Sequence, residues 1–318
     1  MSRYYGLIGY FLNGGLHLKI QNKTDFIQAI QRYSLATPTV IIKPNWITNR
    51  EGEYTEPEIL DWLLEALPDQ KKIIIESYTP WRGLIYQPQN GNDELKVDLA
   101  GGKSYWEFYK EMDLQFLQET GIPDILLSNN AEYINITDCV WGEKCANPSE
   151  VQAVVEQTGY QLTHTDFYAY VPARLFELRE QATLISLSKI KRQLEQPVIG
   201  FSMSIKNLFG LIPHPSRVEF HPEDQNFQGL DTALADIFFL YALLFRESLW
   251  LAEGIFTVAR ELYGVNRSIE KGQELLYLGQ NPLQVDKEAC ESIGVSPQVS
   301  DYYRLIERKA KELGLFGT

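Results

Sequence analysis

The sequence predicts an α/β fold in which a mainly parallel sheet is covered by helices on both faces. Short apolar runs alternate with helical stretches along most of the 318 residues, as in repeated strand–helix units. The runs are apolar throughout instead of alternating with polar residues, which is typical of strands that are buried on both faces. Polar or charged residues follow the runs, at the positions where parallel strands would leave the sheet.

The predicted strands are short runs of β-branched and other large apolar residues. They are residues 39–42, 73–75, 124–127, 184–187, 198–204, 249–252 and 275–278. The N-terminal stretch MSRYYGLIGYFLNGG is also interpreted as a first strand, because it has no small-residue cleavage site of a signal peptide.

The predicted helices carry apolar residues at three- and four-residue spacing, which forms one buried stripe. They are residues 56–67, 105–120, 229–245 and 300–313, with another helix starting near Gln284. Because there is no repeat or long linker, residues 1–318 are expected to form one continuous α/β unit. Residues 77–105 and 131–173 fit the alternation poorly and are interpreted as insertions that form a small lobe or lid.

Charge and composition exclude several classes of protein. A net charge of −13 argues against a nucleic-acid binder that relies on overall charge. No run of about 18 apolar residues is present, so no membrane span is expected. The three cysteines, Cys139, Cys145 and Cys290, are too few for a disulfide framework and contain no CxxC pair. Together these features predict a soluble, cytoplasmic protein.

In open α/β sheets, ligands bind beyond the carboxyl ends of the strands. The residues expected there are Lys43, Asn45, Glu76, Ser128, Asn129, Lys189, Lys191, Lys206, Asn207 and Glu253. Between residues 186 and 217 the chain has five basic residues and one acidic residue, the reverse of its overall balance. Such a local reversal attracts anions, so we predict a pocket for a small carboxylate or phosphate. The simpler interpretation is that each charge only marks where a strand reaches solvent.

The histidines allow one metal site, which we do not assign. Glu219 lies between His214 and His221, so a loop-borne His–Glu–His site is conceivable. The seven-residue spacing is not that of a helical metal pair, and hydrogen bonding within the loop is the simpler interpretation. His214 is also a candidate general acid or base. No group of candidate catalytic or metal-binding residues surrounds His17 or His164 in the sequence.

The common nucleotide and hydrolase motifs are absent. There is no GxGxxG after the first strand, no GxxxxGK[ST], no GxSxG and no HExxH. A nucleotide enzyme of standard type is therefore disfavoured, and the sequence identifies no cofactor.

Four motifs occur together in this chain: KPNW at 43–46, SLSKIK at 186–191, SMSIKNLFG at 202–210 and PLQVDKEA at 282–289. In this order they resemble the family catalogued as domain of unknown function 362, over about residues 39–294. The resemblance implies an α/β fold and a pocket that is built from the motif residues. These are Lys43, Asn45, Lys189, Lys191, Lys206, Asn207 and Asp286.

Members of that family stand alone or are joined to ferredoxin-type iron–sulfur modules. This chain has no run of closely spaced cysteines, so the resemblance implies a stand-alone form, with a separate iron–sulfur redox partner as one option. Many members carry a His just after the second Lys of the KxK element, where Arg192 and Gln193 stand here. This difference weakens any metal site inferred from relatives. The family supplies no reaction.

Two functions fit these observations. The first is an enzyme that acts on a small anionic substrate, with side chains for anion binding, orientation and proton transfer. The anion-binding side chains would be Lys43, Lys189, Lys191, Lys206 and Arg217, with Asn45 and Asn207 orienting the ligand. The candidates for proton transfer are Glu76, Asp286 and His214. A lysine whose pKa is lowered by positive neighbours would serve as base or nucleophile.

The second function is a non-catalytic binder that holds an anionic ligand or cofactor, or delivers it to a redox partner. The sequence does not decide between an enzyme and a binder. It also leaves the substrate, the reaction and the oligomeric state open.

Overall fold

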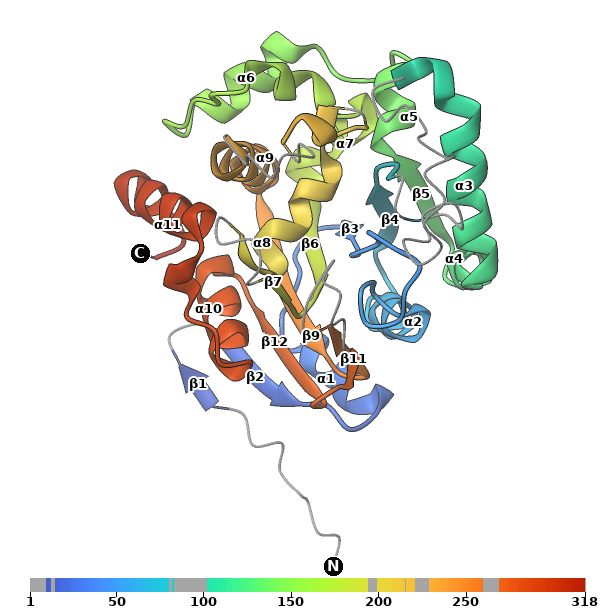
Figure 1. Cartoon of the computed structure of the whole chain (residues 1–318), viewed down its shortest axis with the longest axis vertical. Coiled ribbons are helices and arrows are strands. Elements are labelled where there is room, and N and C mark those ends of the chain that lie inside the picture. The colour runs from blue at the N-terminus through green and yellow to red at the C-terminus, as the bar shows by residue number, and fades with distance from the viewer. Residues whose placement is uncertain are drawn as a thin grey trace, which may run out of the picture.

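The computed structural model describes residues 10–12, 15–79, 82, 102–193, 199–214, 216–220, 229–259 and 269–317 (Figure 1). In this part of the chain, the main sheet has eight strands in the order β1-β2-β12-β9-β6-β3-β4-β5. Their bounds are β1 (Tyr10–Leu12), β2 (Gly15–Lys19), β3 (Thr39–Lys43), β4 (Lys71–Glu76), β5 (Ala131–Asn135), β6 (Ala182–Lys189), β9 (Glu247–Gly254) and β12 (Leu275–Gly279). Strands β9, β6, β3, β4 and β5 are parallel neighbours, whereas β12 runs antiparallel to β9 and β2. The predicted α/β fold with a mainly parallel sheet is confirmed.

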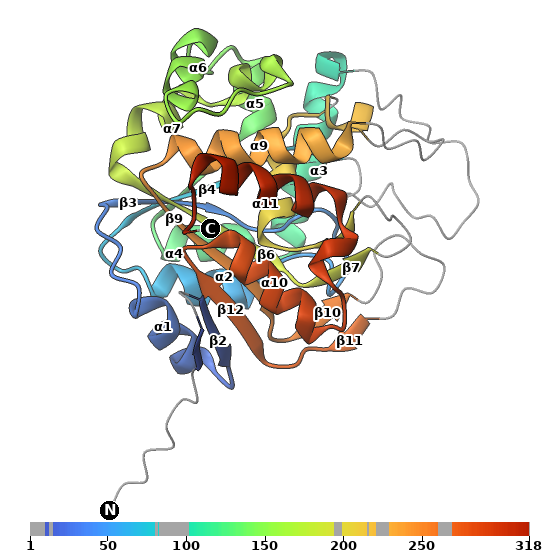
Figure 2. The same ribbon diagram turned by 90° about the vertical axis from the view of Figure 1, so that its left-hand side faces the viewer.

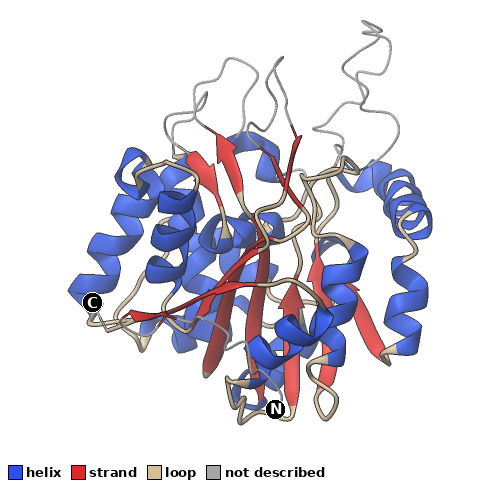
Figure 3. Cartoon of the chain, turned by 90° about the horizontal axis from the view of Figure 1, so that it is seen from below, coloured by secondary structure: helices blue, strands red, loops and turns tan. Residues whose placement is uncertain are grey.

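Helices cover both faces of the sheet, and the strands lie between them (Figures 2 and 3). One face packs against α1 (Lys23–Gln31), α2 (Pro57–Glu65), α3 (Trp106–Glu119) and α4 (Ile122–Ser128). The other packs against α6 (Pro148–Glu156), α9 (Leu230–Leu244), α10 (Pro282–Ser292) and α11 (Asp301–Leu313). Successive strand residues face opposite sides, so Val40 and Ile42 join the first core and Ile41 joins the second. This two-sided burial explains why the central strands are apolar throughout.

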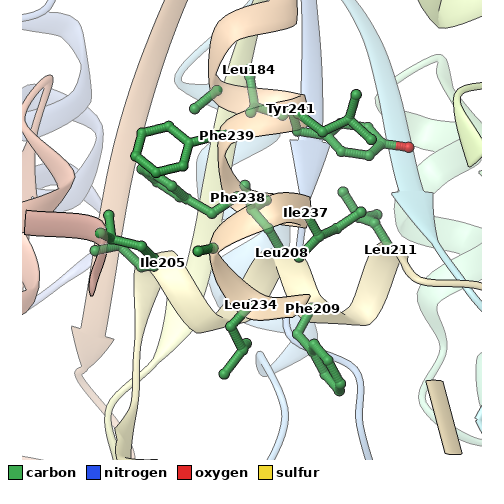
Figure 4. Packing of buried hydrophobic residues seen from close by; sticks show 14 of the residues in the cluster. Leu184, Ile205, Leu208, Phe209, Leu211, Leu234, Ile237, Phe238, Phe239 and Tyr241 are labelled. Carbon is green, nitrogen blue, oxygen red and sulfur yellow. The ribbon is translucent and has the colours of Figure 1, made fainter. Parts of the chain in front are cut away.

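Helix α9 is apolar nearly all round because it is buried on nearly all sides. It packs against α11 and against the segment 204–211, whose residues Ile205, Leu208 and Leu211 gather beside Leu234 and Ile237 of α9 (Figure 4). Across the residues that the structure describes, no helix combines the length and apolar character that crossing a bilayer requires.

A second, small sheet lies beyond the carboxyl ends of two central strands. Its strands are β7 (Lys191–Gln193), β8 (Gly200–Ser202), β10 (Thr257–Ala259) and β11 (Ile269–Lys271), in the order β11-β10-β7-β8. Only Ile190 separates β6 from β7, and Ala259 of β10 pairs with Lys191 of β7. The small sheet therefore continues the β6–β9 pairing and holds Lys191 just past the edge of the main sheet.

One predicted strand is wrong. Residues 124–127 lie within helix α4, and the strand of this region is β5, which starts at Ala131. Gly121, with φ of 70°, and Pro123 in the first turn favour a helix start here. Ser128 and Asn129 consequently line a surface cavity with Lys72 at the amino ends of the strands, opposite to the predicted ligand edge.

The two predicted insertions are described to different extents. The predicted insertion 131–173 begins with β5, a strand of the main sheet, and continues into α5 (Ile136–Trp141) and α6. Much of the predicted insertion 77–105 lies outside the described residues. The predicted strand 198–204 is only β8, which belongs to the small sheet, and Ser204 already begins α8 (Ser204–Asn207). Whether residues 1–318 form one continuous unit stays a prediction.

Candidate functional site

The carboxyl ends of β3 and β4 bring Lys43 and Glu76 together as a buried ion pair. These residues end neighbouring parallel strands, and the Lys43 ammonium donates to Glu76 Oε1 at 2.5 Å and to the Pro44 carbonyl at 2.7 Å. The Trp46 amide also donates to Glu76 Oε1, at 3.3 Å. Burial lowers the pKa of Lys43 to about 8, although the Glu76 charge opposes this shift.

Asn207 connects three of the sequence motifs. Its Nδ2 donates to the Lys43 carbonyl at 2.8 Å and to the Ser186 hydroxyl at 3.1 Å. Its Oδ1 accepts from Asn45 Nδ2 at 3.0 Å, and Asn45 Oδ1 in turn accepts from the Lys191 ammonium. The KPNW, SLSKIK and KNLFG segments, far apart in the chain, therefore meet at one edge of the sheet.

Lys206 and Lys191 are buried lysines that lack a carboxylate partner among the described residues. Lys206 is 6% exposed and makes no hydrogen bond or ion pair in that part of the chain, and its ammonium lies 5.7 Å from the centre of the Phe209 ring. Burial, reinforced by the charge of Arg217, lowers the pKa of Lys206 to about 7. Burial and then the nearby charge of Lys206 hold the pKa of Lys191 well below its ordinary value. Lys191 also donates to the Glu53 carbonyl at 3.1 Å.

Lys189 differs because two neighbouring carboxylates balance its charge. Its ammonium contacts the Glu56 carboxylate and lies 3.0 Å from Glu253 Oε1. The Thr257 hydroxyl also donates to Glu56. Burial raises the pKa of Glu253 to about 7, although the charge of Lys189 opposes the shift. Of the predicted anion-binding lysines, Lys189 is thus the one with two carboxylate partners.

Several residues of this network were not predicted from the sequence. Arg82 lies 3.3 Å from Glu76 Oε2, pairs with Asp113 and donates to the Trp46 carbonyl at 2.8 Å. Asp113 comes from helix α3, and no pattern in the sequence links it to Arg82. Glu53 and Glu56 lie in the connection between β3, which ends at Lys43, and α2, so their place after a strand end was a usable signal.

Asp286 lies in helix α10 and fixes the start of α8. Its carboxylate accepts from the Ser204 amide at 2.9 Å, from the Ile205 amide at 3.1 Å and from the Ser204 hydroxyl. Burial raises the pKa of Asp286 to about 7, partly offset by these hydrogen bonds. The contacts place Asp286 behind α8, where it positions Lys206 indirectly.

His214 lies in an aromatic environment. Its ring centre is 4.4 Å from that of Tyr109, and its backbone amide donates to the Thr137 hydroxyl at 3.4 Å. Arg217, close in the sequence, donates to the Tyr78 carbonyl. Glu219 is exposed, and His221 lies outside the described residues. Within the described ranges, no group of three or more His, Cys, Asp or Glu side chains is arranged to hold a metal ion.

The KNLFG segment explains how the site is built. Ile205, Leu208 and Leu211 pack on α9 (Figure 4), so this face anchors the segment in the core. A Cβ atom at Gly210 would lie 2.8 Å from Lys43 Nζ, so a larger residue here would force the end of the buried Lys43 side chain to shift. Apolar residues therefore fix the segment, and the Lys, Asn and Gly positions face the site.

A family model described as domain of unknown function (DUF362) matches residues 40–291. The match includes the strand ends that carry Lys43, Glu76 and Lys189, and also α8 and the Asp286 helix. Neither curated proteins nor solved structures gave a match to the chain.

Proposed function

The chain belongs to the DUF362 family, and since that family is defined without an activity, we propose a function from the site itself: binding of a small carboxylate or phosphate anion. Lys43, Lys191, Lys206 and Arg217 would surround the anion. The observation that carries this proposal is the largely buried Lys206 side chain, whose ammonium has no carboxylate or hydrogen-bond partner among the described residues. A buried charge without a partner costs several kcal/mol, and a bound anion would remove much of that cost.

The distribution of partners supports an anion at this position. Lys43, Arg82 and Lys189 each have a carboxylate within ion-pair distance. Lys191 and Lys206 have none in the described part of the chain. These two lysines lie close enough to interact, because the charge of Lys206 lowers the pKa of Lys191, and Lys191 donates to Asn45, which in turn donates to Asn207. Two neighbouring lysines beside side-chain amide groups suit the recognition of a carboxylate or phosphate.

Enzyme and binder make different demands on the acidic residues. Glu76 contacts Lys43, Trp46, Ser77 and Arg82 through its two oxygens, and Asp286 is committed to the start of α8. These contacts commit both carboxylates to structural roles, which favours the non-catalytic alternative. A lysine whose pKa lies near 7, such as Lys206, favours the enzyme, because proton transfer is most efficient near the working pH.

Isothermal titration calorimetry with oxalate and with phosphate tests the proposal. We expect the wild-type protein to bind at least one of them near pH 6.5. Lys206→Met should weaken that binding about tenfold or more, because one charged hydrogen bond contributes roughly 1.5–3 kcal/mol. Lys309→Met, which removes an exposed lysine of α11, should change nothing. An affinity that Lys206→Met leaves intact would contradict the proposed site.

A further inference from the structure

We propose that Lys206 is a nucleophile whose amine forms an imine with the carbonyl group of a small oxo-carboxylate. The inference rests on the proposed anion site and names its substrate class. Lys191 and Arg217 would hold the carboxylate, and the adjacent carbonyl carbon would face Lys206 Nζ.

The first argument is that the amine of Lys206 is the uncommitted one. Lys43 and Lys189 donate to carboxylates, and Lys191 donates to Asn45 and to the Glu53 carbonyl. Lys206 makes no such bond in the described residues, yet it is nearly buried. A nucleophilic amine needs a free lone pair, and among these four lysines only Lys206 has neither a carboxylate nor a carbonyl partner there.

The second argument is that the chain around Lys206 is fixed by contacts that do not involve the Lys206 amine. Helix α8, which carries it, starts on the Asp286 carboxylate, and its neighbours Ile205 and Leu208 are fully buried against α9. Such support from packing and from a second layer of hydrogen bonds is what a reactive group requires. The Phe209 ring, 5.7 Å from the ammonium, provides an apolar wall on one side.

The third argument is electrostatic. The charge of Arg217 and the burial of the side chain favour the neutral amine, and they lower the pKa of Lys206 to about 7. Near neutral pH a substantial fraction of Lys206 is therefore unprotonated. The same positive neighbours attract a carboxylate, so one arrangement both activates the amine and binds the anionic part of the substrate.

The chemistry balances without any oxidant or reductant. The Nζ lone pair attacks the carbonyl carbon, and the π electrons of the C=O bond move to oxygen, which takes a proton. The resulting carbinolamine loses a proton from nitrogen and its hydroxyl group as water, and the C=N bond forms. Amine and carbonyl are converted into imine and one water molecule. The protonated imine keeps a positive charge beside the carboxylate.

Reductive trapping tests this inference on the full-length protein. The protein is incubated with glyoxylate and sodium borohydride, which reduces an imine to a stable secondary amine, and peptides are analysed by mass spectrometry. We expect carboxymethyl-lysine at position 206, and excess oxalate should suppress it. In the matched variant Lys309→Arg, which removes an exposed lysine outside the site, the adduct at position 206 should form as in the wild type.

The outcomes separate the two proposals. If oxalate binds but glyoxylate modifies only exposed lysines such as Lys309, the imine inference is overturned and the anion site stands. If Lys206 is modified at the same rate with and without oxalate, the reaction does not use the anion site, which also overturns the inference. If neither oxalate nor phosphate binds and no adduct forms at Lys206, the proposed function fails together with the inference.

Discussion

At the scale of single residues, the state of each buried lysine is decided by its partner. Lys189 sits between two carboxylates, Lys43 faces one, and Lys206 faces none within the described residues. Burial penalises the charged form of each side chain, and a nearby carboxylate compensates for this penalty. These three lysines look alike in the sequence, but their surroundings give them different chemical environments.

The close approach of Gly210 to Lys43 leads to a prediction about a substitution at Gly210. In Gly210→Ala the new methyl group would lie 2.8 Å from Lys43 Nζ and 3.0 Å from its Cε, while Glu76 Oε1 stands 3.6 Å away. We expect a loss of about 1–3 kcal/mol in the free energy of unfolding, as for other overpacked sites, together with weaker anion binding. Urea unfolding and calorimetry with oxalate measure both effects.

The double variant Lys43→Ser, Gly210→Ala provides the control. Removing the long side chain removes the atoms that the methyl group would meet, so Gly210→Ala should cost little in the Lys43→Ser background. Equal costs in the two backgrounds would show that the penalty arises elsewhere, and the proposed close approach of Gly210 to Lys43 would be wrong.

At the scale of elements, helix α8 carries the site although it is only one turn long. An isolated helix of this length is unstable in water. Its stability comes from the Asp286 carboxylate at its start and from the packing of Ile205 and Leu208 against α9. Asp286 was one of three candidates for proton transfer, and that role stays a prediction, while its contacts give it a structural role at the start of the helix. Spacing in the sequence cannot separate these roles, because α8 and α10 meet only in the folded chain.

A second pair of elements is joined by His164 and Asp236. His164 precedes a 3-10 helix (Thr165–Tyr170), and its Nδ1 lies 2.8 Å from the fully buried Asp236 of α9. The Tyr160 hydroxyl donates to the same carboxylate at 2.9 Å. His164 therefore has a chemical partner after all, 72 residues away in the sequence. That separation explains why the local sequence around His164 gave no sign of it.

This pair predicts a pH dependence of stability. The hydrogen bond with Asp236 raises the pKa of His164 above its ordinary value, with smaller contributions from Asp166 and Asp231. The pair therefore stabilises the fold fully below about pH 6.5, the pKa of an unfolded histidine, and the stabilisation is lost as the pH rises through the folded-state pKa. His164→Gln should cost about 1 kcal/mol at pH 5.5 and less at pH 8.5.

Urea unfolding of both proteins at several pH values measures this difference. The wild type alone is insufficient, because burial also brings the pKa values of Glu253 and Asp286 to about 7. Subtracting the His164→Gln curve removes their contributions. A difference between the two proteins that does not change with pH would rule out a titrating His164.

At the scale of the whole molecule, the sequence predicted the sheet better than the site. Apolar runs and helical stripes are local signals, so β3, β4, β6 and the five predicted helices, α2, α3, α9, α10 and α11, were found within a few residues of their bounds. Shorter helices such as α1 and α6 were not predicted. The run 124–127 failed because a short apolar segment fits a strand and a buried helix equally well. The lysines at the strand ends were also predictable. Glu253 was also expected at this edge, but its pairing with Lys189, and that of Glu56, were not predicted, because pairing depends on long-range contacts.

The balance of charge over the molecule leads to a last prediction, which concerns the pH dependence of anion binding. The chain carries a net charge of −13, so a small anion gains nothing from the overall field and must rely on the lysines of the site. An anion favours protonated Lys206, whose pKa in the free protein is about 7. Oxalate remains a dianion from about pH 6 to 9, so only the protein titrates. The affinity of the protein for oxalate should therefore fall above pH 7, by up to about tenfold per pH unit for each proton whose binding is linked to that of oxalate.

Calorimetry in two buffers of different ionisation enthalpy checks this directly, because the protein should take up protons on binding oxalate at pH 8 and few at pH 6. Lys206→Arg is the matched control, since Arg stays charged throughout this range. Its oxalate affinity should vary less with pH, and proton uptake at pH 8 should decrease. Because Lys191 also has a lowered pKa, some uptake should remain in the variant. Equal uptake in the wild type and in Lys206→Arg would exclude Lys206 as the group that responds to the anion.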